Sequence, residues 1–165
     1  MPLLSVYFSL GSNLGDRKAN ILEAVRRMDD SFGTGAKALS TLVETSPVGF
    51  SGGMFLNAVV MYRLAIPASS VEKAALSILD KVEAIERSMG RTGKGERDAQ
   101  GNRIYHSRTI DIDILFIGAE TIDCPRLTVP HEGISDRPFV LVPLREVARP
   151  ALKKAFPGFF VNSTI

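Results

Sequence analysis

The sequence predicts an α+β fold with a ferredoxin-like βαββαβ core, in which helices pack on an antiparallel sheet, followed by a C-terminal extension. In several segments the residues form strand-like apolar patterns. In two segments between them, apolar residues recur every three or four positions, which is typical of helices. A β-branched run over 109–117 supplies the last strand of the core and contains two aspartates two residues apart.

The first half of the chain contains a helix followed by two strands, after an opening strand. Each boundary rests on a change in apolar spacing or on a cluster of Gly, Pro, Ser and Asn residues. In order, we expect a strand over 4–10, a turn over 11–16, a helix from 19 to about 29, a strand over 39–44, a loop over 45–54 and a strand over 55–64.

The second helix has the strongest pattern. Ser69 and Glu72 form a capping-box sequence after Pro67, which predicts the start of the helix. Gly90 is expected to end it in a left-handed conformation. Between them, apolar residues in steps of four and three form one stripe: Val71, Ala75, Ile78, Val82, Ile85 and Met89. Beyond the last core strand we expect one short strand and a short helix near 139–147.

Length and composition indicate a soluble globular chain. The 165 residues match one domain, which we expect to span 1–165, and 45% are hydrophobic and 23% charged. No apolar run approaches the roughly 20 residues that span a bilayer. Cys124 is the single cysteine, which excludes an intrachain disulfide framework and a Cys-based zinc site. We therefore expect a cytoplasmic monomer without a signal peptide.

Charge is concentrated in one segment. The net charge of +2 is too small for a general nucleic-acid binder, so neither a nucleic acid nor a membrane is expected as a partner. From Arg87 to Arg108, however, six basic residues stand against two acidic ones. A concentration of this kind predicts a small polyanionic ligand.

Asp111 and Asp113 are the first candidates for chemistry. Side chains alternate along a strand, so both carboxylates are expected on one face, with Cα atoms about 6.5 Å apart. A carboxylate pair of this kind suits hard divalent cations such as Mg²⁺. With a basic, Gly-rich stretch just upstream, the pair predicts action on a nucleotide.

Six motifs resemble one known family in order and spacing. They are Gly11–Leu14, Glu44–Gly49, Phe55–Ala58, Glu86–Arg91, Arg108–Leu115 and Arg126–His131. Over nearly its whole length the chain resembles the 6-hydroxymethyl-7,8-dihydropterin pyrophosphokinases of folate biosynthesis. The resemblance implies a Mg²⁺-dependent transferase that moves pyrophosphate from ATP to the hydroxymethyl group of the reduced pterin and releases AMP.

The resemblance also implies a set of site residues. Asp111 and Asp113 would hold two Mg²⁺ ions, and Arg91 and Arg108 would act with them in catalysis. The implied ATP-binding residues are Glu86, Arg91, Arg108, Ile114, Arg126, Leu127, Thr128, His131 and Arg137. The implied pterin-binding residues are Thr45, Val48, Phe55, Asn57, Asp111 and Phe139.

The chain departs from the family pattern at several positions. Ser46 stands where proline is common, Phe55 where tyrosine is usual and Glu132 where an aromatic residue is common. These changes affect loop rigidity and affinity rather than the reaction. The basic loop over 92–107 matches the family's mobile ATP-clamping loop only in character, because its residues do not align individually.

Other interpretations are open at this point. A ferredoxin-like module that binds RNA or metal without catalysis would expose aromatic residues on its central strands. Here those strands carry carboxylates and aliphatic residues, which argues against it. A nucleotidyltransferase or an ordinary kinase could use the same carboxylate pair and would differ in the leaving group. For Glu86 the alternative is an exposed helix acid, and for His131 a structural histidine.

Overall fold

The computed structural model describes residues 2–45, 54–90, 99–100 and 109–160. Its elements are β1 (Leu3–Ser12), α1 (Arg17–Phe32), β2 (Ala38–Leu39), β3 (Val43–Thr45), β4 (Phe55–Ala65), α2 (Val71–Ser88), β5 (Asp111–Ile117), β6 (Ile122–Cys124), β7 (Leu127–Val129), the 3₁₀ turn η1 (Ile134–Asp136), α3 (Pro138–Val147), α4 (Pro150–Ala155) and the 3₁₀ turn η2 (Pro157–Phe159).

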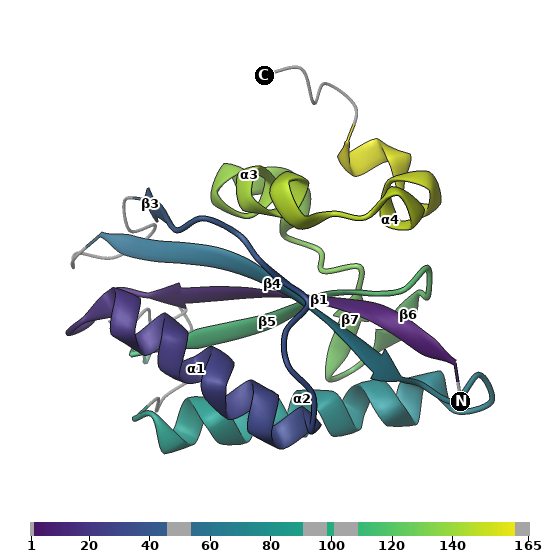
Figure 1. The fold of residues 1–165 in the computed structure, drawn as a ribbon, viewed down its shortest axis with the longest axis horizontal. Coiled ribbons are helices and arrows are strands. Elements are labelled where there is room, and N and C mark those ends of the chain that lie inside the picture. Colours follow the sequence, from purple (N-terminus) through teal and green to yellow (C-terminus); the bar gives the residue numbers. More distant parts are fainter. Residues whose placement is uncertain (1, 46–53, 91–98, 101–108, 161–165) are drawn as a thin grey trace.

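The main sheet lies between two helical layers. Its strands run in the order β2-β4-β1-β5, β3 also pairs with β4, and every pairing is antiparallel. Helices α1 and α2 cover one face, and α3 and α4 cover the other (Figure 1). With β2 and β3 taken as one interrupted strand, the order is the expected βαββαβ. The predicted α+β class is therefore confirmed.

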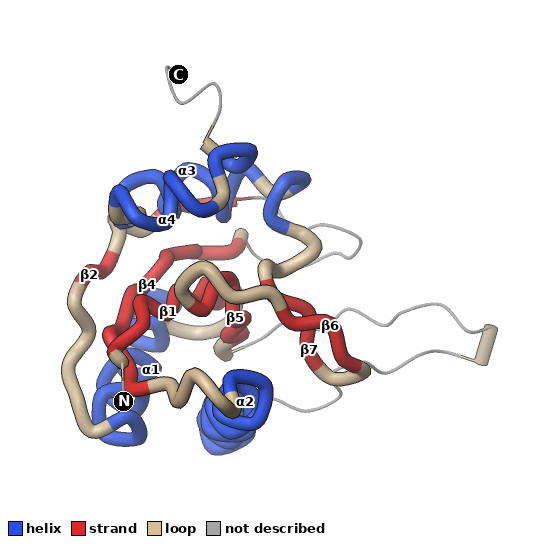
Figure 2. Tube along the Cα trace, turned by 90° about the vertical axis from the view of Figure 1, so that its right-hand side faces the viewer, coloured by secondary structure: helices blue, strands red, loops and turns tan. Residues whose placement is uncertain are grey.

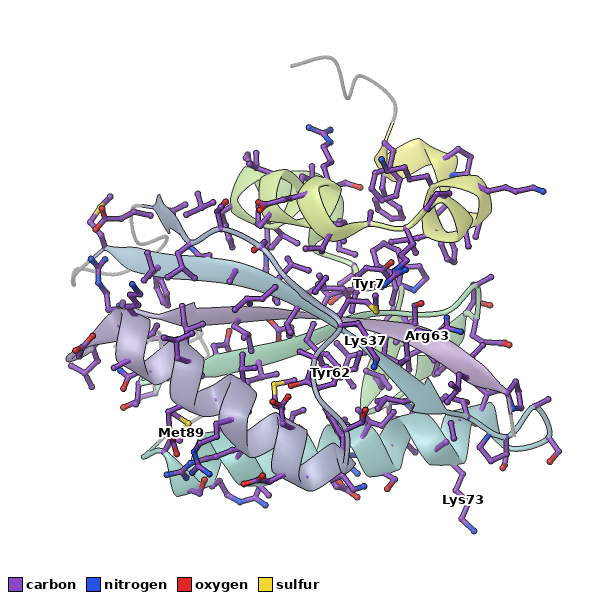
Figure 3. All side chains as sticks on the ribbon, in the orientation of Figure 1. Tyr7, Lys37, Tyr62, Arg63, Lys73 and Met89 are labelled. Carbon is purple, nitrogen blue, oxygen red and sulfur yellow. The ribbon has the colours of Figure 1, made fainter. Side chains whose placement is uncertain are left out.

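Each face of the sheet belongs to its own apolar core. Val6, Phe8 and Leu10 of β1 are buried against α1 and α2, whereas Tyr7 is buried in the core under α3 and α4. Figure 3 shows Tyr7 and Tyr62 on these opposite sides. Because both faces are covered, β1 and β4 are buried along most of their length.

Specific caps determine where α1 begins and ends. The Asp16 carboxylate accepts the Ala19 N–H at 3.1 Å, as an N-cap should. Gly33 ends the helix at φ 70°, and its N–H donates to the Asp29 carbonyl. The helix thus runs to Phe32, about one turn beyond the expected end.

The expected strand over 39–44 is wrong as a single element, because the chain leaves the ladder after Leu39 and rejoins it at Val43. Buried Ser40 accepts the Val59 N–H through its hydroxyl rather than its carbonyl. The next residue, Thr41, donates its N–H to the Glu146 carboxylate of α3. Ser40 still donates its own N–H to the Val59 carbonyl, so these side-chain bonds replace only part of the strand pairing in the gap.

Two further boundaries differ from the prediction. The turn expected at 11–16 begins later, since Gly11 and Ser12 still pair with β4. The capping box at Ser69 is wrong: Ser70 is the N-cap of α2 and makes no side-chain cap bond. The expected end of α2 is confirmed, because Gly90 has φ 97°.

The C-terminal extension forms more structure than the sequence indicated. The expected helix near 139–147 is α3, but β6 and β7 form a hairpin where one strand was expected, and α4 was not predicted. This extension supplies the second helical layer. Within the described ranges, no helix combines the length and apolar character needed to cross a membrane.

Tyr62 joins β4 to the end of α1. Its hydroxyl donates to Asp29 Oδ1 at 2.6 Å and also lies 3.2 Å from the Val25 carbonyl. Burial, and then the bond to Asp29, raises the pKa of Tyr62 far above its ordinary 10.0.

We expect Tyr62→Phe to lower the free energy of unfolding by about 1–3 kcal/mol, because a bond to a charged acceptor is lost. Because the pKa of Tyr62 is higher in the folded than in the unfolded state, the neutral hydroxyl contributes its full stabilisation below the unfolded-state pKa of 10.0. This contribution declines as the pH rises above that pKa. Denaturant unfolding at pH 7 and pH 11 measures both effects. The difference between the two proteins should shrink at pH 11; an unchanged unfolding midpoint at pH 7 would contradict the prediction.

Candidate active site

Asp111 and Asp113 lie on the same face of the sheet, toward α3. In the ladder with β1, Asp111 pairs with Gly11 and Asp113 with Ser9. Both aspartates are partly exposed, whereas Ile112 between them is buried in the α1–α2 core. The expected shared face is therefore confirmed. Their strand is at the edge of the main sheet.

Gly11, which has no side chain, lies on β1 beside the carboxylates. It pairs with Asp111 on β5 and with Asn57 on β4, so the three residues form one row across the sheet. A Cβ at Gly11 would lie 3.2 Å from Asn57 Oδ1 and 3.5 Å from Phe55 Cδ1. Asn57 and Phe55 therefore approach the Gly11 backbone closely, and a side chain at this position would crowd both of them.

Asn57 is held in one orientation by β3. Its amide nitrogen donates to Thr45 Oγ1 at 2.9 Å and to the Val43 carbonyl at 3.3 Å. Because both donors are directed to β3, the amide oxygen faces Gly11. The structure therefore brings three of the expected pterin-binding residues, Thr45, Phe55 and Asn57, next to Gly11 and Asp111.

Helix α3 lies over β3 and β4 on this face. Phe139, near its start, is partly buried against the α3–α4 core. Arg137 precedes the helix, and its guanidinium Nε is 2.8 Å from where a Cβ on Gly133 would be. Gly133 thus allows Arg137 to lie against the backbone of the preceding turn.

A cavity of about 280 Å³ lies at the free edge of β5. It is bounded by α2, β5 and the β6–β7 hairpin, which lies beside β5 (Figure 2). The lining residues are Leu79, Glu83, Ile112, Asp113, Ile114, Pro125, Arg126, Leu127, Thr128, His131 and Glu132. Five of the expected ATP-binding residues therefore meet in one place, together with Asp113. The volume is at the small end for ligand sites and suits one part of a larger ligand.

His131 has a defined tautomer when it is neutral. Its Nδ1 accepts the Gly133 N–H at 3.0 Å, and its own backbone N–H donates to the Leu115 carbonyl. Since Nδ1 is an acceptor here, the ring proton of the neutral form resides on Nε2. His131 thus offers a hydrogen-bond donor at the cavity wall.

Arg126 is held at the cavity by α2. Its Nη2 contacts Asp80 Oδ1 at 2.8 Å and Glu83 Oε1 at 2.9 Å. The hydrogen bond to Asp80 raises the pKa of the guanidinium, which remains charged in any case. Arg126 and Asp80 are solvent-exposed and Glu83 is partly exposed, so these ion pairs orient Arg126 more than they stabilise the fold.

Glu86 is buried, so the alternative of an exposed helix acid is wrong. It is 1% exposed, and its Oε2 accepts the Ile112 N–H at 2.8 Å. This amide belongs to the peptide that joins Asp111 to Ile112, on the side of β5 away from β1. Glu86 therefore restrains the backbone between the two aspartates. It does not line the cavity in this structure.

The carboxylate pair has the donor chemistry for Mg²⁺. Two hard oxygen ligands project from neighbouring same-face positions, partly exposed and next to the cavity. Within the described part of the chain, no cluster of three or more His, Cys, Asp or Glu side chains could enclose a metal. Mg²⁺ usually keeps several water ligands and takes others from substrate phosphates, so two protein carboxylates suffice as a starting set for a bound ion.

Three expected site residues, Arg91, Arg108 and Val48, lie outside the described residues, as do Ser46 and the loop 92–107 except for residues 99–100. The sequence reasoning missed Gly11 and Ser9, which pair with the aspartates. A glycine inside a strand is the signal that could have identified Gly11, because it often marks a close approach of backbone or ligand.

Comparison with known proteins identifies the family. The family model for 7,8-dihydro-6-hydroxymethylpterin-pyrophosphokinase (HPPK) matches residues 7–149. The 2-amino-4-hydroxy-6-hydroxymethyldihydropteridine pyrophosphokinase of Porphyromonas gingivalis is 40% identical over 145 residues, which cover 87% of this chain and 90% of that protein. The protein of the same name from Bacillus subtilis is 32% identical over 150 residues, 90% of this chain and 81% of that one.

Two longer proteins also match. The folate synthesis bifunctional protein of Arabidopsis thaliana is 38% identical over 140 residues, which are 84% of this chain but 26% of that protein. A solved structure described as HPPK-DHPS in complex with substrates aligns with all of this chain and 45% of its own, with a TM-score of 0.62 and 13% identity. This last likeness supports the fold alone. The family match and the close relatives show that the chain belongs to the HPPK family and is a pyrophosphokinase of folate biosynthesis.

Proposed function

We propose that the chain transfers the terminal pyrophosphoryl group of ATP to the hydroxymethyl oxygen of 6-hydroxymethyl-7,8-dihydropterin and releases AMP. The observation that carries the proposal is the position of Asp113. Asp113 lies on the same sheet face as Asp111, which pairs with Gly11. Asp113 also lines the cavity at the edge of β5. The carboxylate pair thus lies between two separate regions that could hold two substrates.

The cavity suits the nucleotide. Ile114 and Leu127 offer apolar surface for a base, and Thr128 and His131 offer hydrogen-bonding groups at the same wall. His131 can donate from Nε2 to a phosphate oxygen, and Arg126 places a permanent positive charge at the rim. Pyrophosphoryl transfer depends mainly on positioning and on neutralising phosphate charge, which these groups can supply.

The face of the sheet under α3 suits the pterin. Gly11 has no side chain to keep a flat ring away from the backbone of β1, and the Asn57 amide oxygen beside it can accept from the ring's N–H groups. The ring of Phe55 lies close enough to Gly11 to contact the same ligand. Phe139 is proposed as a second aromatic contact from α3, and Thr45 keeps Asn57 in orientation.

The two aspartates are proposed to hold the cofactor. Two Mg²⁺ ions bound by Asp111 and Asp113 would neutralise phosphate charge and promote deprotonation of the attacking hydroxyl. Glu86 would keep the peptide between the aspartates in place by accepting the Ile112 N–H. Arg91 and Arg108 remain predicted phosphate-binding residues.

The position of an isotope in the products tests the proposal. The chain is incubated with MgCl₂, the reduced pterin and ATP labelled in its β-phosphate, and the products are separated by chromatography. Pyrophosphoryl transfer predicts AMP without label and pterin diphosphate with label. Label retained in ADP, with no AMP, would overturn the proposal in favour of an ordinary kinase. A reaction without pterin measures any unrelated hydrolysis of ATP.

We further infer that residues 1–165 act as one domain in a cytoplasmic monomer. Light scattering coupled to gel filtration should give a mass near the 17.9 kDa of the chain. A mass twice this value, unchanged on dilution, would contradict the monomer.

A further inference from the structure

Arg17, the first residue of α1, connects three parts of the fold. Its Nη1 donates to Glu44 Oε1 of β3 at 2.7 Å and to the Met54 carbonyl, just before β4, also at 2.7 Å. The two acceptors are distant in sequence from Arg17, by 27 and 37 residues. One guanidinium nitrogen thus joins the end of β3 and the start of β4 to the helix.

The position of Arg17 is not explained by the stability of α1. A positive charge at the first helical position opposes the helix dipole, and the acidic residue at this end of α1 is the N-cap Asp16, which bonds the Ala19 N–H rather than Arg17. The Arg17 side chain is 31% exposed, less than that of Arg26 on the same helix, which is 60% exposed. The contacts with β3 and β4 are therefore the main structural role of this side chain.

These contacts are adjacent to the proposed pterin-binding residues. Glu44 precedes Thr45, and Met54 precedes Phe55; in the ladder, Thr45 pairs with Phe55. Side chains alternate along a strand, so Glu44 faces α1 while Thr45 binds Asn57 on the opposite face. Arg17 thus restrains the two strand ends from behind the sheet.

We propose that Arg17 is a positioning residue for the pterin side of the active site, an inference that rests on the proposed function. By tying Glu44 and the Met54 carbonyl to α1, it holds Thr45 and Phe55 at the separation that the pterin requires. Small displacements of binding groups can greatly weaken recognition of a flat, polar ligand. The cavity at β5 contains none of these residues, so ATP binding should be independent of Arg17.

Separate affinities for the two substrates test this role. We expect Arg17→Ala to raise the pterin KM and the dissociation constant of the fluorescent probe 6-hydroxymethylpterin about tenfold. The ATP KM should stay within about twofold. Arg17→Lys should give an intermediate value, because an ammonium group can reach one acceptor but lacks the planar geometry of the guanidinium. Arg26→Ala, which also removes ion pairs from α1, is the matched control and should change neither constant.

Glu44→Gln tests whether Arg17 acts through Glu44. It should raise the pterin KM less than Arg17→Ala, and the double variant should be no weaker than Arg17→Ala alone. An unchanged pterin KM in Arg17→Ala, while the wild-type chain makes AMP, would overturn the inference and leave the proposed function intact. Equal losses for ATP and pterin with a lowered Tm would also overturn it, since that pattern indicates general destabilisation. A wild-type chain that makes no AMP would refute the proposed function, and the probe titration would still test Arg17.

Discussion

Asp111→Asn and Asp113→Asn should each lower kcat about a hundredfold or more. Mutating a residue that only hydrogen-bonds a metal ligand already lowers metal affinity or activity about 10–100-fold, and a ligand itself should contribute at least as much. Both carboxylates lie outside the two apolar cores, so the variants should fold. The change removes one negative charge while it keeps the shape of the side chain. Initial rates across a Mg²⁺ titration, with ATP and pterin saturating, measure the effect.

Two controls separate metal loss from general damage. Asp123→Asn removes an exposed carboxylate from a neighbouring strand, β6, and should leave the rate unchanged. Chelation by EDTA should stop the wild-type reaction, and added Mg²⁺ should restore it. If either active-site variant keeps a near-native rate at low Mg²⁺, the assignment of the metal to this pair is wrong.

Gly11→Val should raise the pterin KM roughly five- to 150-fold, because its side chain would occupy the space beside Asn57 and Phe55. Even the Cβ would lie 3.2 Å from Asn57 Oδ1, which forces that amide to move. The fold should tolerate the change, since valine favours β-strands and the Gly11 backbone has regular antiparallel strand pairing. Steady-state kinetics with each substrate varied in turn, together with Tm, measure the result.

Ser5→Val is the matched control for this prediction. Ser5 lies on β1 in the same alternating set as Gly11, but near the other end of the strand, where its hydroxyl accepts from Arg63. The control should leave both KM values unchanged. A pterin KM unaffected by Gly11→Val would show that the pterin does not bind against this part of β1.

Many features of the fold followed from local patterns. The stripe of apolar residues in α2 and the β-branched run of β5 predicted both elements, because each period matches only one regular structure. The shared face of Asp111 and Asp113 also followed, since alternation along a strand is a local property. Recognition of the family rested on short motifs read in order, and the family comparison confirmed it.

Errors arose where distant side chains decide the local backbone. The strand expected over 39–44 is interrupted because Ser40 bonds Val59 and Thr41 bonds Glu146, 105 residues away. The sequence around Thr41 contains no sign of that partner. For the same reason the second helical layer, which depends on the docking of α3 and α4, was only partly expected.

The sequence by itself determined the order of the main elements, the family and the presence of two carboxylates on one strand face. Only the tertiary structure decided what surrounds them: Gly11 beside Asp111, the cavity that Asp113 shares with His131, and the buried Glu86 that accepts the Ile112 N–H. The physical reason is that periodicity and capping act over a few residues. The environment of a side chain depends instead on register and packing between segments that the sequence separates.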